Sequence, residues 1–482
     1  MQFAARGVLL FAVAFSTIGA ARTDGLQAWL ARMRTASGPV WRAHVASTSY
    51  LTISGEPVAI ASDAQGTGLL LRECSGALCT GTYFDGSQIF SVDMNGSRFL
   101  QERDPQTYLR GVRMMDSLAF LDPGFSAAGG TIADGGYRRF EGRDLRVLLV
   151  TAPGATAMEA LVDPASGLVR FARDSAGANV FEYRDYRRIP GGLTVPFYEL
   201  RNGTTVERYA ARSVDAAALP KPSGIGVRVQ GRFEPVPLDA GFRTPVVPCR
   251  VGNVTVRCLV DSGNSGLAMS TELARRIGAQ QVGAFTVTGI GAYVTGVVRA
   301  GGLAVGNAEF GPANYVVLRD IHDLGYDVVL GADFFAATTV TLDARGVSLG
   351  EVAPSNPAAR VALSFAGFVP IAPVELGTLP THLAVDTGDE SAVNVSGDVL
   401  SAHPGLFRVT GTRKVVGVGG NAVEQTGTID RMRIGDLVVT EQDIAATPAL
   451  RGIAPGHLGM GFLGTFATFF DYPDAALTLS AP

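Results

Sequence analysis

The stretches CLVDSGNSG (258–266) and LAVDTGDES (383–391) follow one design: an apolar run, then Asp, then a small hydroxyl residue, then Gly. The two Asp residues, Asp261 and Asp386, stand 125 residues apart (386 − 261), which is about the length of a small domain. One such Asp alone is an ordinary solvated turn residue. Its recurrence raises the question of whether the chain contains one unit twice.

Other landmarks recur in the same order as the two Asp residues. The first set is Gly289-Ile290-Gly291, Val305-Gly306 and Leu330-Gly331, leading into Phe334-Phe335; the second is Gly417-Val418-Gly419, Ile434-Gly435 and Leu458-Gly459, leading into Phe462-Leu463. Their offsets are 128, 129 and 128 residues (417 − 289, 434 − 305 and 458 − 330). Asp343 and Asp471 each close a similar final strand. The near-constant offsets predict two homologous lobes, residues 227–350 and 355–482.

The repeated motif indicates a particular chemistry if the two loops meet on a shared axis. Two carboxyl groups that lie close together cannot both ionise comfortably, so one keeps its proton and the pair titrates as a unit. The carboxylate can then deprotonate a water molecule while the carboxylic acid polarises a peptide carbonyl. This is direct attack by water, without an acyl-enzyme.

The repeat resembles the aspartic peptidases of retropepsin type, with both lobes fused in one chain. The resemblance implies a mainly β, bilobal module of β-barrel lobes in which Asp261 and Asp386 form the catalytic dyad. It implies a hydroxyl lock of Ser262 and Thr387 beneath the dyad, with Gly263 and Gly388 as turn backbone. Two flaps would close over an extended peptide; they are segments 287–294 (with Gly289, Ile290, Gly291 and Tyr293) and 415–422 (with Gly417, Val418 and Gly419). Tyr293 could contact substrate or serve in ordinary strand packing.

The sequence departs from the family pattern directly after each Asp-Ser/Thr-Gly. The family usually has Ala there, whereas this chain has Asn264 and Asp389. If Asp389 pointed inward, its charge would raise the pKa values of the dyad. We expect it instead to point outward, as a solvated loop carboxylate.

The region before the repeats has another character. Residues 25–36 have helical spacing, with Leu26, Trp29, Leu30 and Met33 on one face, and a long run of strand-like segments follows. We predict a helix-plus-antiparallel-β-meander domain over 25–213 and a linker over 214–226. The domain loosely resembles the bacterial periplasmic lipoprotein-carrier family, through Tyr83-Phe84-Asp85-Gly86 and GGLTVPFYELRNG. The alternative is an extra β domain without a ligand.

The N-terminus predicts export. Arg6 precedes the apolar run 7–15, and Gly19 and Ala21 provide a plausible cleavage site, so residues 1–21 read as a signal peptide. We expect a periplasmic or secreted protein with no integral membrane segment after signal removal. In that compartment the local pairs Cys74/Cys79 and Cys249/Cys258 are expected to form disulfides; buried free thiols are the alternative.

Composition limits the remaining possibilities. The net charge is −4 with both signs interspersed, and the 60 Gly residues stand at turns between short apolar runs, which favours a β-rich globular protein that does not bind nucleic acid. The sequence calls for no metal and no organic cofactor. The expected function is an exported aspartic endopeptidase that acts on polypeptides as a monomer, because both lobes lie in one chain. The rival is a catalytically inert peptide- or lipid-binding carrier.

Overall fold

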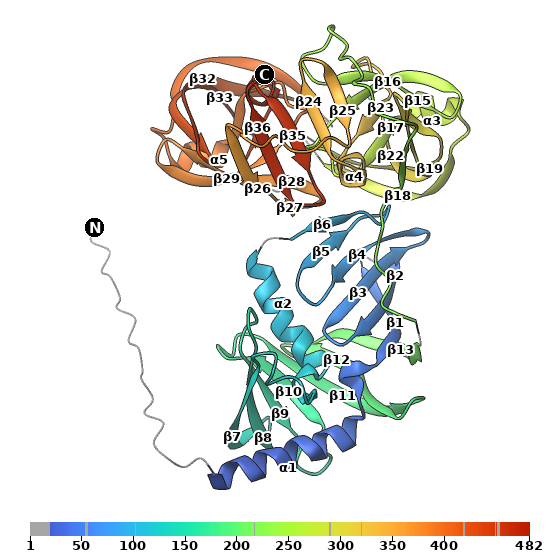
Figure 1. Cartoon of the computed structure of the whole chain (residues 1–482), viewed down its shortest axis with the longest axis vertical. Helices are drawn as coiled ribbons and strands as arrows, with labels where there is room; N and C mark the ends of the chain where they lie inside the picture. The colour runs from blue at the N-terminus through green and yellow to red at the C-terminus, as the bar shows by residue number, and fades with distance from the viewer. Residues whose placement is uncertain are drawn as a thin grey trace. The chain divides into compact units, whose positions relative to one another are not determined.

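The computed structural model describes residues 20–53, 56–101, 103–215, 217–288, 291–319, 321–417, 420–448, 450 and 454–482. The signal peptide predicted over 1–21 lies outside these residues except for its last two positions. The chain divides into two units, and the division is not linear in sequence. The first unit contains residues up to 45, 65–67 and 107–216, and the second contains 46–64, 68–106 and 217–482. Both are mainly β (Figure 1).

The first unit places helices against an antiparallel sheet. Its helices are α1 (Ala20–Ser37), η1 (Val40–Arg42), η2 (Ala119–Leu121) and most of α2 (Arg103–Asp116). Its strands follow one another in chain order across the sheet: β7 (Thr131–Phe140), β8 (Arg143–Thr151), β9 (Met158–Val162), β10 (Val169–Asp174), β11 (Val180–Ile189), β12 (Leu193–Arg201) and β13 (Thr204–Asp215). Leu30 and Met33 of α1 are buried against this sheet, as the helical spacing predicts. Residues 217–226, which follow β13, contain neither helix nor strand.

The second unit begins with a meander of six strands in chain order. These are β1 (His44–Ile53), β2 (Glu56–Gln65), β3 (Gly68–Ser75), β4 (Leu78–Phe84), β5 (Ile89–Val92) and β6 (Arg98–Leu100). Cys74 and Cys79 face each other across the β3–β4 hairpin and form a disulfide. This confirms the pairing expected from their spacing.

The first repeat is a sheet built around the Asp261 loop. Its elements are β14 (Val227–Val229), β15 (Val246–Val251), β16 (Val254–Val260), β17 (Leu267–Ser270), α3 (Thr271–Arg276), β18 (Gln280–Thr288), β19 (Ala292–Ala300), β20 (Leu303–Val305), β21 (Ala308–Phe310), β22 (Ala313–Leu318), β23 (Val328–Leu330) and α4 (Ala332–Ala337). The inner order is β16-β23-β17-β22-β19-β18, in which β16–β23 and β17–β22 are parallel pairs. A disulfide between Cys249 and Cys258, also as expected, links β15 to β16.

The second repeat shows the same order of pairings. Its elements are β27 (Ser364–Ala366), β28 (Val369–Leu376), β29 (Leu379–Val385), β30 (Val393–Ser396), α5 (Gly397–Ala402), β31 (Arg408–Gly417), β32 (Gly420–Ile434), β33 (Leu437–Thr447), β34 (Gly456–Leu458) and α6 (Met460–Leu463). The inner order is β29-β34-β30-β33-β32-β31, and the parallel pairs are β29–β34 and β30–β33. Over these six strands, this is the arrangement around Asp261.

A five-stranded sheet joins the two repeats. It contains β24 (Val340–Asp343) and β25 (Gly346–Leu349) from the first, β35 (Ala467–Asp471) and β36 (Ala476–Ser480) from the second, and β26 (Ala359–Ala362). Strand β24 pairs with β35, so that Val340 lies opposite Phe470 (Figure 1). The shared sheet ties the ends of both repeats together.

The meander is packed into the same unit through an aromatic cluster. Phe99 of β6 is fully buried, and its ring lies 5.4 Å from that of Phe365, 5.3 Å from that of Phe368 and 6.3 Å from that of Tyr472. These rings belong to the core shared by both repeats. The strands before residue 107 therefore contribute to the interior of the unit that holds the Asp loops.

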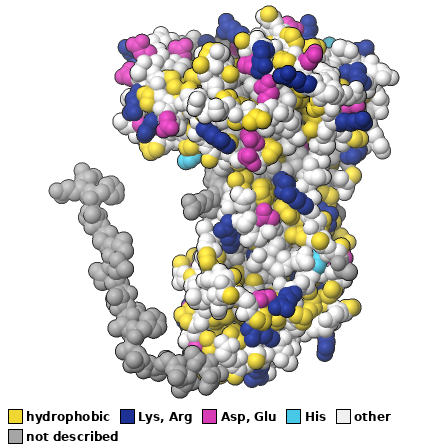
Figure 2. Space-filling model, viewed as in Figure 1, with side chains coloured by type: hydrophobic (Ala, Val, Ile, Leu, Met, Phe, Trp, Pro, Cys, Tyr) yellow, Lys and Arg dark blue, Asp and Glu magenta, His cyan; other side chains and the backbone are white. Residues whose placement is uncertain are grey.

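Surface charge is mixed, as the composition suggests. On the face drawn in Figure 2, Lys and Arg side chains are interspersed with Asp and Glu. Among the residues that the structure describes, no helix is long and apolar enough to cross a membrane.

Candidate active site

Each Asp loop leaves a buried strand and is fixed by the short strand beside it. The backbone N–H of Asp261 donates to the carbonyl of Leu330, and that of Asp386 donates to the carbonyl of Leu458, both at 3.0 Å. Gly must follow each Leu because a Cβ at Gly331 or Gly459 would collide with carbonyl oxygens of the adjacent Asp loop. Each Leu-Gly landmark thus packs against its Asp loop and holds the loop through this backbone hydrogen bond.

Ser262 and Thr387 connect the two loops by reciprocal hydrogen bonds. The Ser262 N–H donates to Thr387 Oγ1 at 2.9 Å, and the Thr387 N–H donates to Ser262 Oγ at 3.1 Å. Each hydroxyl also donates across the interface at 2.7 Å, Ser262 to the carbonyl of Val385 and Thr387 to that of Val260. Both residues are completely buried, and their polar groups are satisfied within the lock.

Above this lock the carboxyl groups of Asp261 and Asp386 meet. Each accepts a hydrogen bond of 2.9 Å from the N–H of the Gly in its own loop, Gly263 for Asp261 and Gly388 for Asp386. A Cβ at Gly388 would lie 2.7 Å from the carboxyl carbon of Asp261, and one at Gly263 would overlap the Asp386 carboxyl. Each carboxyl group therefore lies over the glycine of the opposite loop, where only hydrogen leaves room.

The closeness of the two carboxyls changes how they titrate. Burial raises the pKa of Asp261 well above its ordinary range, and the negative charge of Asp386 and a hydrogen bond between the two groups raise it further. The pKa of Asp386 is raised as well, chiefly by burial. A pair of this kind retains one proton over a wide range of pH.

Residues 247–334 match the family model of the aspartyl protease. This span contains Asp261, the lock residue Ser262 and the Leu330-Gly331 landmark, and it lies within the first repeat. No curated protein matches the chain. The region that is similar to aspartyl proteases therefore includes the Asp261 loop, which is hydrogen-bonded to the Asp386 loop through Ser262 and Thr387.

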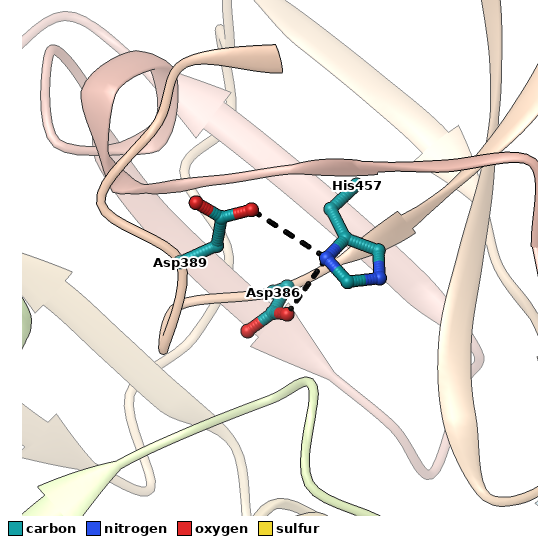
Figure 3. A group of neighbouring side chains, drawn as sticks. All are labelled: Asp386, Asp389 and His457. Carbon is teal, nitrogen blue, oxygen red and sulfur yellow. Dashed lines mark ion pairs between the residues drawn. The ribbon is translucent and has the colours of Figure 1, made fainter. Parts of the chain in front are cut away.

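A third ionisable group, His457, lies beside Asp386 and was not predicted from the sequence. His457 belongs to β34, and its Nδ1 lies 3.2 Å from Asp386 Oδ2 and 3.5 Å from Asp389 Oδ2 (Figure 3). Asp389 is fixed in turn, because its Oδ1 accepts hydrogen bonds from the N–H and hydroxyl of Ser391 at 2.8 and 2.6 Å. The expectation that Asp389 points outward into solvent was wrong: its carboxylate faces His457 on the Asp386 side of the site, because the buried imidazole supplies a partner for it.

The three groups of this trio shift one another's pKa values. Burial lowers the pKa of His457, but the hydrogen bond to Asp389 and the charge of Asp386 outweigh this effect and raise that pKa to about 9. For the carboxyl of Asp389, burial has the opposite effect and raises the pKa, but the contact with His457 outweighs it and brings that pKa below its ordinary value. The charge of His457 lowers the pKa of Asp386, opposing both burial and Asp389. His457 is thus an imidazolium at neutral pH.

The same trio has the spacing of a cation site, since its ligand atoms lie within 4.8 Å of one another. In the structure, His457 Nδ1 contacts both carboxylates directly. We therefore describe the trio as an ion-pair cluster.

A comparison of the repeats could have revealed His457. In the pairing of β16 with β23, Leu259 faces Val329; in the pairing of β29 with β34, Ala384 faces His457. Val329 and His457 are therefore equivalent positions. Asn264 and Asp389 are equivalent in the same way, so the second repeat carries a cation and an anion where the first carries two neutral side chains.

Two hairpins occupy the positions predicted for flaps. In β18–β19, Thr288 pairs with Ala292, and in β31–β32, Gly417 pairs with Gly420. Gly291 is described at the first tip, whereas Gly289 and Ile290, and Val418 and Gly419 at the second tip, lie outside the described residues. The ring of Tyr293 is half-buried and lies 4.7 Å from the guanidinium of Arg319, which fits a packing role.

Proposed function

We propose that this protein is an exported aspartic endopeptidase in which Asp261 and Asp386 activate one water molecule. The observation that carries the proposal is the meeting of the two carboxyl groups above the Ser262–Thr387 lock, each over the glycine of the opposite loop. The aspartyl protease match over 247–334 supports the same class of chemistry for the first repeat.

The proposed reaction needs one proton between the two carboxyls. Water attacks the carbonyl carbon of a peptide bond, its proton passes to the ionised carboxylate, and the carboxylic acid protonates the carbonyl oxygen. The resulting gem-diol collapses as the amine leaving group receives a proton, and the pair returns to its starting state. Preorganisation of both groups by the lock avoids reorganisation during the reaction.

The substrate would be an extended segment of polypeptide held beneath the two hairpins. Both hairpins expose apolar side chains, among them Val294 on β19 and Val416 on β31, which are 63% and 71% exposed. Exposed valines near hairpin tips are unfavourable in water and would be covered by the side chains of a bound peptide.

The matching strand order around Asp261 and Asp386 supports the view that the repeats are two homologous lobes. In this proposal both carboxyls come from one chain, so a monomer is sufficient. Two disulfides favour an oxidising compartment and are in keeping with export.

The carrier alternative finds less support. Large side chains such as Met115, Phe120 and Leu121 fill the core of the first unit. A shallow depression lined by Leu193 and Val214, among others, measures about 230 Å³, less than the pockets that enclose small-molecule ligands. This unit is therefore better explained as a scaffold or substrate-recruiting domain.

Binding of a reaction-intermediate mimic tests the proposal. A hexapeptide with a hydroxyethylene group in place of the central peptide bond carries a hydroxyl where the gem-diol would form. We expect it to raise the melting temperature of the wild type, and to bind at least tenfold more weakly to Asp261→Asn and to Asp386→Asn. Asp436→Asn, at an exposed turn, is the matched control. Equal binding to all four proteins would refute the dyad.

A further inference from the structure

The two halves of the candidate site differ in charge. On the Asp261 side, the positions equivalent to His457 and Asp389 hold Val329 and Asn264, which are neutral. On the Asp386 side, the His457 imidazole points at both Asp386 and Asp389 (Figure 3). Among the residues that the structure describes, a cation thus lies next to Asp386 but not next to Asp261.

The surroundings of His457 contain few other ionisable groups. Strand β34 lies between β29 and β30, and the loop after β29 supplies Asp386 and Asp389. Asp261, from the opposite loop, acts on His457 more weakly than either of these. The charge of Asp261 acts on Tyr326, and the charges of both carboxyls act on Tyr472. Both tyrosines are neutral, because burial raises the pKa of each above its ordinary value. The local balance is therefore set by three carboxyls and one imidazole.

We propose that His457, anchored by Asp389, is a positioning residue that keeps Asp386 as the ionised member of the pair and leaves the shared proton on Asp261. The geometry carries this assignment, since His457 Nδ1 lies 3.2 Å from Asp386 Oδ2 and its strand holds it there. Asp389 serves as the second anchor, and Ser391 fixes its orientation.

The assignment gives each carboxyl one role in the proposed reaction, on which it rests. Asp386 receives the proton of the attacking water, while Asp261 gives its proton to the carbonyl oxygen. In the collapse of the gem-diol, Asp386 passes its proton to the departing nitrogen and Asp261 regains one from a gem-diol hydroxyl. Protons and electron pairs balance, and His457 itself transfers nothing.

The pH dependence of cleavage tests the assignment, because the two anchors carry opposite charges. In His457→Gln the Asp389 charge is left uncompensated beside Asp386, so the acid limb of kcat/KM should move to higher pH by about one unit. In Asp389→Asn the imidazolium is left uncompensated, so the limb should move about one unit to lower pH. The double variant should fall between the two. A merely structural role would lower the rate of both variants without opposite shifts.

A titration of His457 by histidine-selective 15N NMR supplies a readout that does not need activity. The chain has five His residues, which keeps the spectrum simple. We expect the pKa of His457 to lie near 9 in the wild type. It should fall in Asp386→Asn and in Asp389→Asn, fall less in Asp261→Asn, and stay unchanged in Asp436→Asn.

The outcomes separate this inference from the proposed function. An inactive wild type with a high His457 pKa that depends on Asp386 would refute the peptidase and leave the assignment standing. If the wild type is active, and the two variants shift the acid limb in the same direction or do not shift it, the assignment is refuted and the proposed function is not. A His457 pKa at or below its ordinary value, or one lowered as much by Asp261→Asn as by Asp386→Asn, would overturn it as well.

Discussion

Ser262 and Thr387 each donate a backbone N–H to the hydroxyl of the other, at 2.9 and 3.1 Å, in a completely buried setting. The two residues stand 125 positions apart in the chain (387 − 262). These reciprocal hydrogen bonds hold the two Asp loops in a fixed position relative to each other. Each hydroxyl both accepts and donates, so neither can be removed without leaving a buried polar group unpaired.

Removal of one hydroxyl from the lock should therefore weaken both stability and activity. In Ser262→Ala the Thr387 N–H loses its acceptor, and the Val385 carbonyl loses its donor. We expect a loss of about 1–3 kcal/mol in the free energy of unfolding and a fall in kcat/KM. Urea unfolding and peptide cleavage measure the two effects. Ser262→Thr, which keeps the hydroxyl, should retain most of both; if it behaves like Ser262→Ala, the lock is not the cause.

A methyl group at Gly388 should abolish activity while leaving most of the fold. The added Cβ would lie 2.7 Å from the carboxyl carbon of Asp261, so the carboxyl pair must separate. We expect kcat/KM in Gly388→Ala to drop by at least about a hundredfold, because small displacements of catalytic groups are costly. Gly405→Ala is the matched control, since nothing lies within 4 Å of its Cβ position. Wild-type kinetics in Gly388→Ala would contradict the described geometry.

A second buried carboxyl pair predicts how stability depends on pH. Asp93, beside β5, is 3% exposed and Asp333, in α4, is fully buried. Burial raises the pKa of Asp93 well above its ordinary value, and the charge of Asp333 adds to this. Because the folded-state pKa lies above the unfolded one, the neutral form favours folding at acid pH. This stabilisation is lost as pH rises from about 4 through the raised pKa.

Replacement of Asp93 by Asn tests this prediction. The amide keeps an acceptor for the N–H groups of Asn95 and Ser97, which donate to Asp93 Oδ1 at 2.9 and 2.8 Å, and it cannot ionise. We expect little change in the urea midpoint at pH 4.5 and a higher midpoint than that of the wild type at pH 8. Asp436→Asn should show no such difference between the two pH values. An equal effect of Asp93→Asn at both would rule out the titration of Asp93 as the cause.

Truncation of Phe99 should destabilise the unit that contains the carboxyl pair. Its ring is fully buried among Phe365, Phe368 and Tyr472. We expect Phe99→Ala to cost about 3–5 kcal/mol of unfolding free energy, and the loss of activity on heating should track unfolding. Tyr50→Ala, at a 64% exposed side chain, is the comparison. Unchanged thermal inactivation in Phe99→Ala would show that the meander is not integral to this unit.

Some parts of the site could be predicted from the sequence because their signals are local. Each Asp-Ser/Thr-Gly motif lies at the end of a short apolar run, and so does each Leu-Gly landmark. Because these local patterns recur in the same order, the sequence alone predicts that Asp261 and Asp386 act together. The disulfides were predicted for the same reason, since each pair closes a short loop.

Other parts could not be predicted because their contacts join distant segments. Nothing in the pattern around Phe99 indicates that its ring packs on Phe365, 266 residues further on (365 − 99). The repeat offset marks His457 as the position equivalent to Val329, but it does not show that the imidazole contacts Asp386, and Asp389 has the sequence context of a solvated loop carboxylate. Only the register of β29 with β34 places these two side chains beside Asp386.

The most direct test of the account is cleavage of an unfolded protein substrate from pH 3 to 8 by the wild type, Asp261→Asn, Asp386→Asn and Asp436→Asn. If one water molecule needs both carboxyls, the wild type and Asp436→Asn cleave, and each of the other two loses at least about a thousandfold in rate while melting as a folded protein. Cleavage that survives in either Asp261→Asn or Asp386→Asn would contradict the shared dyad.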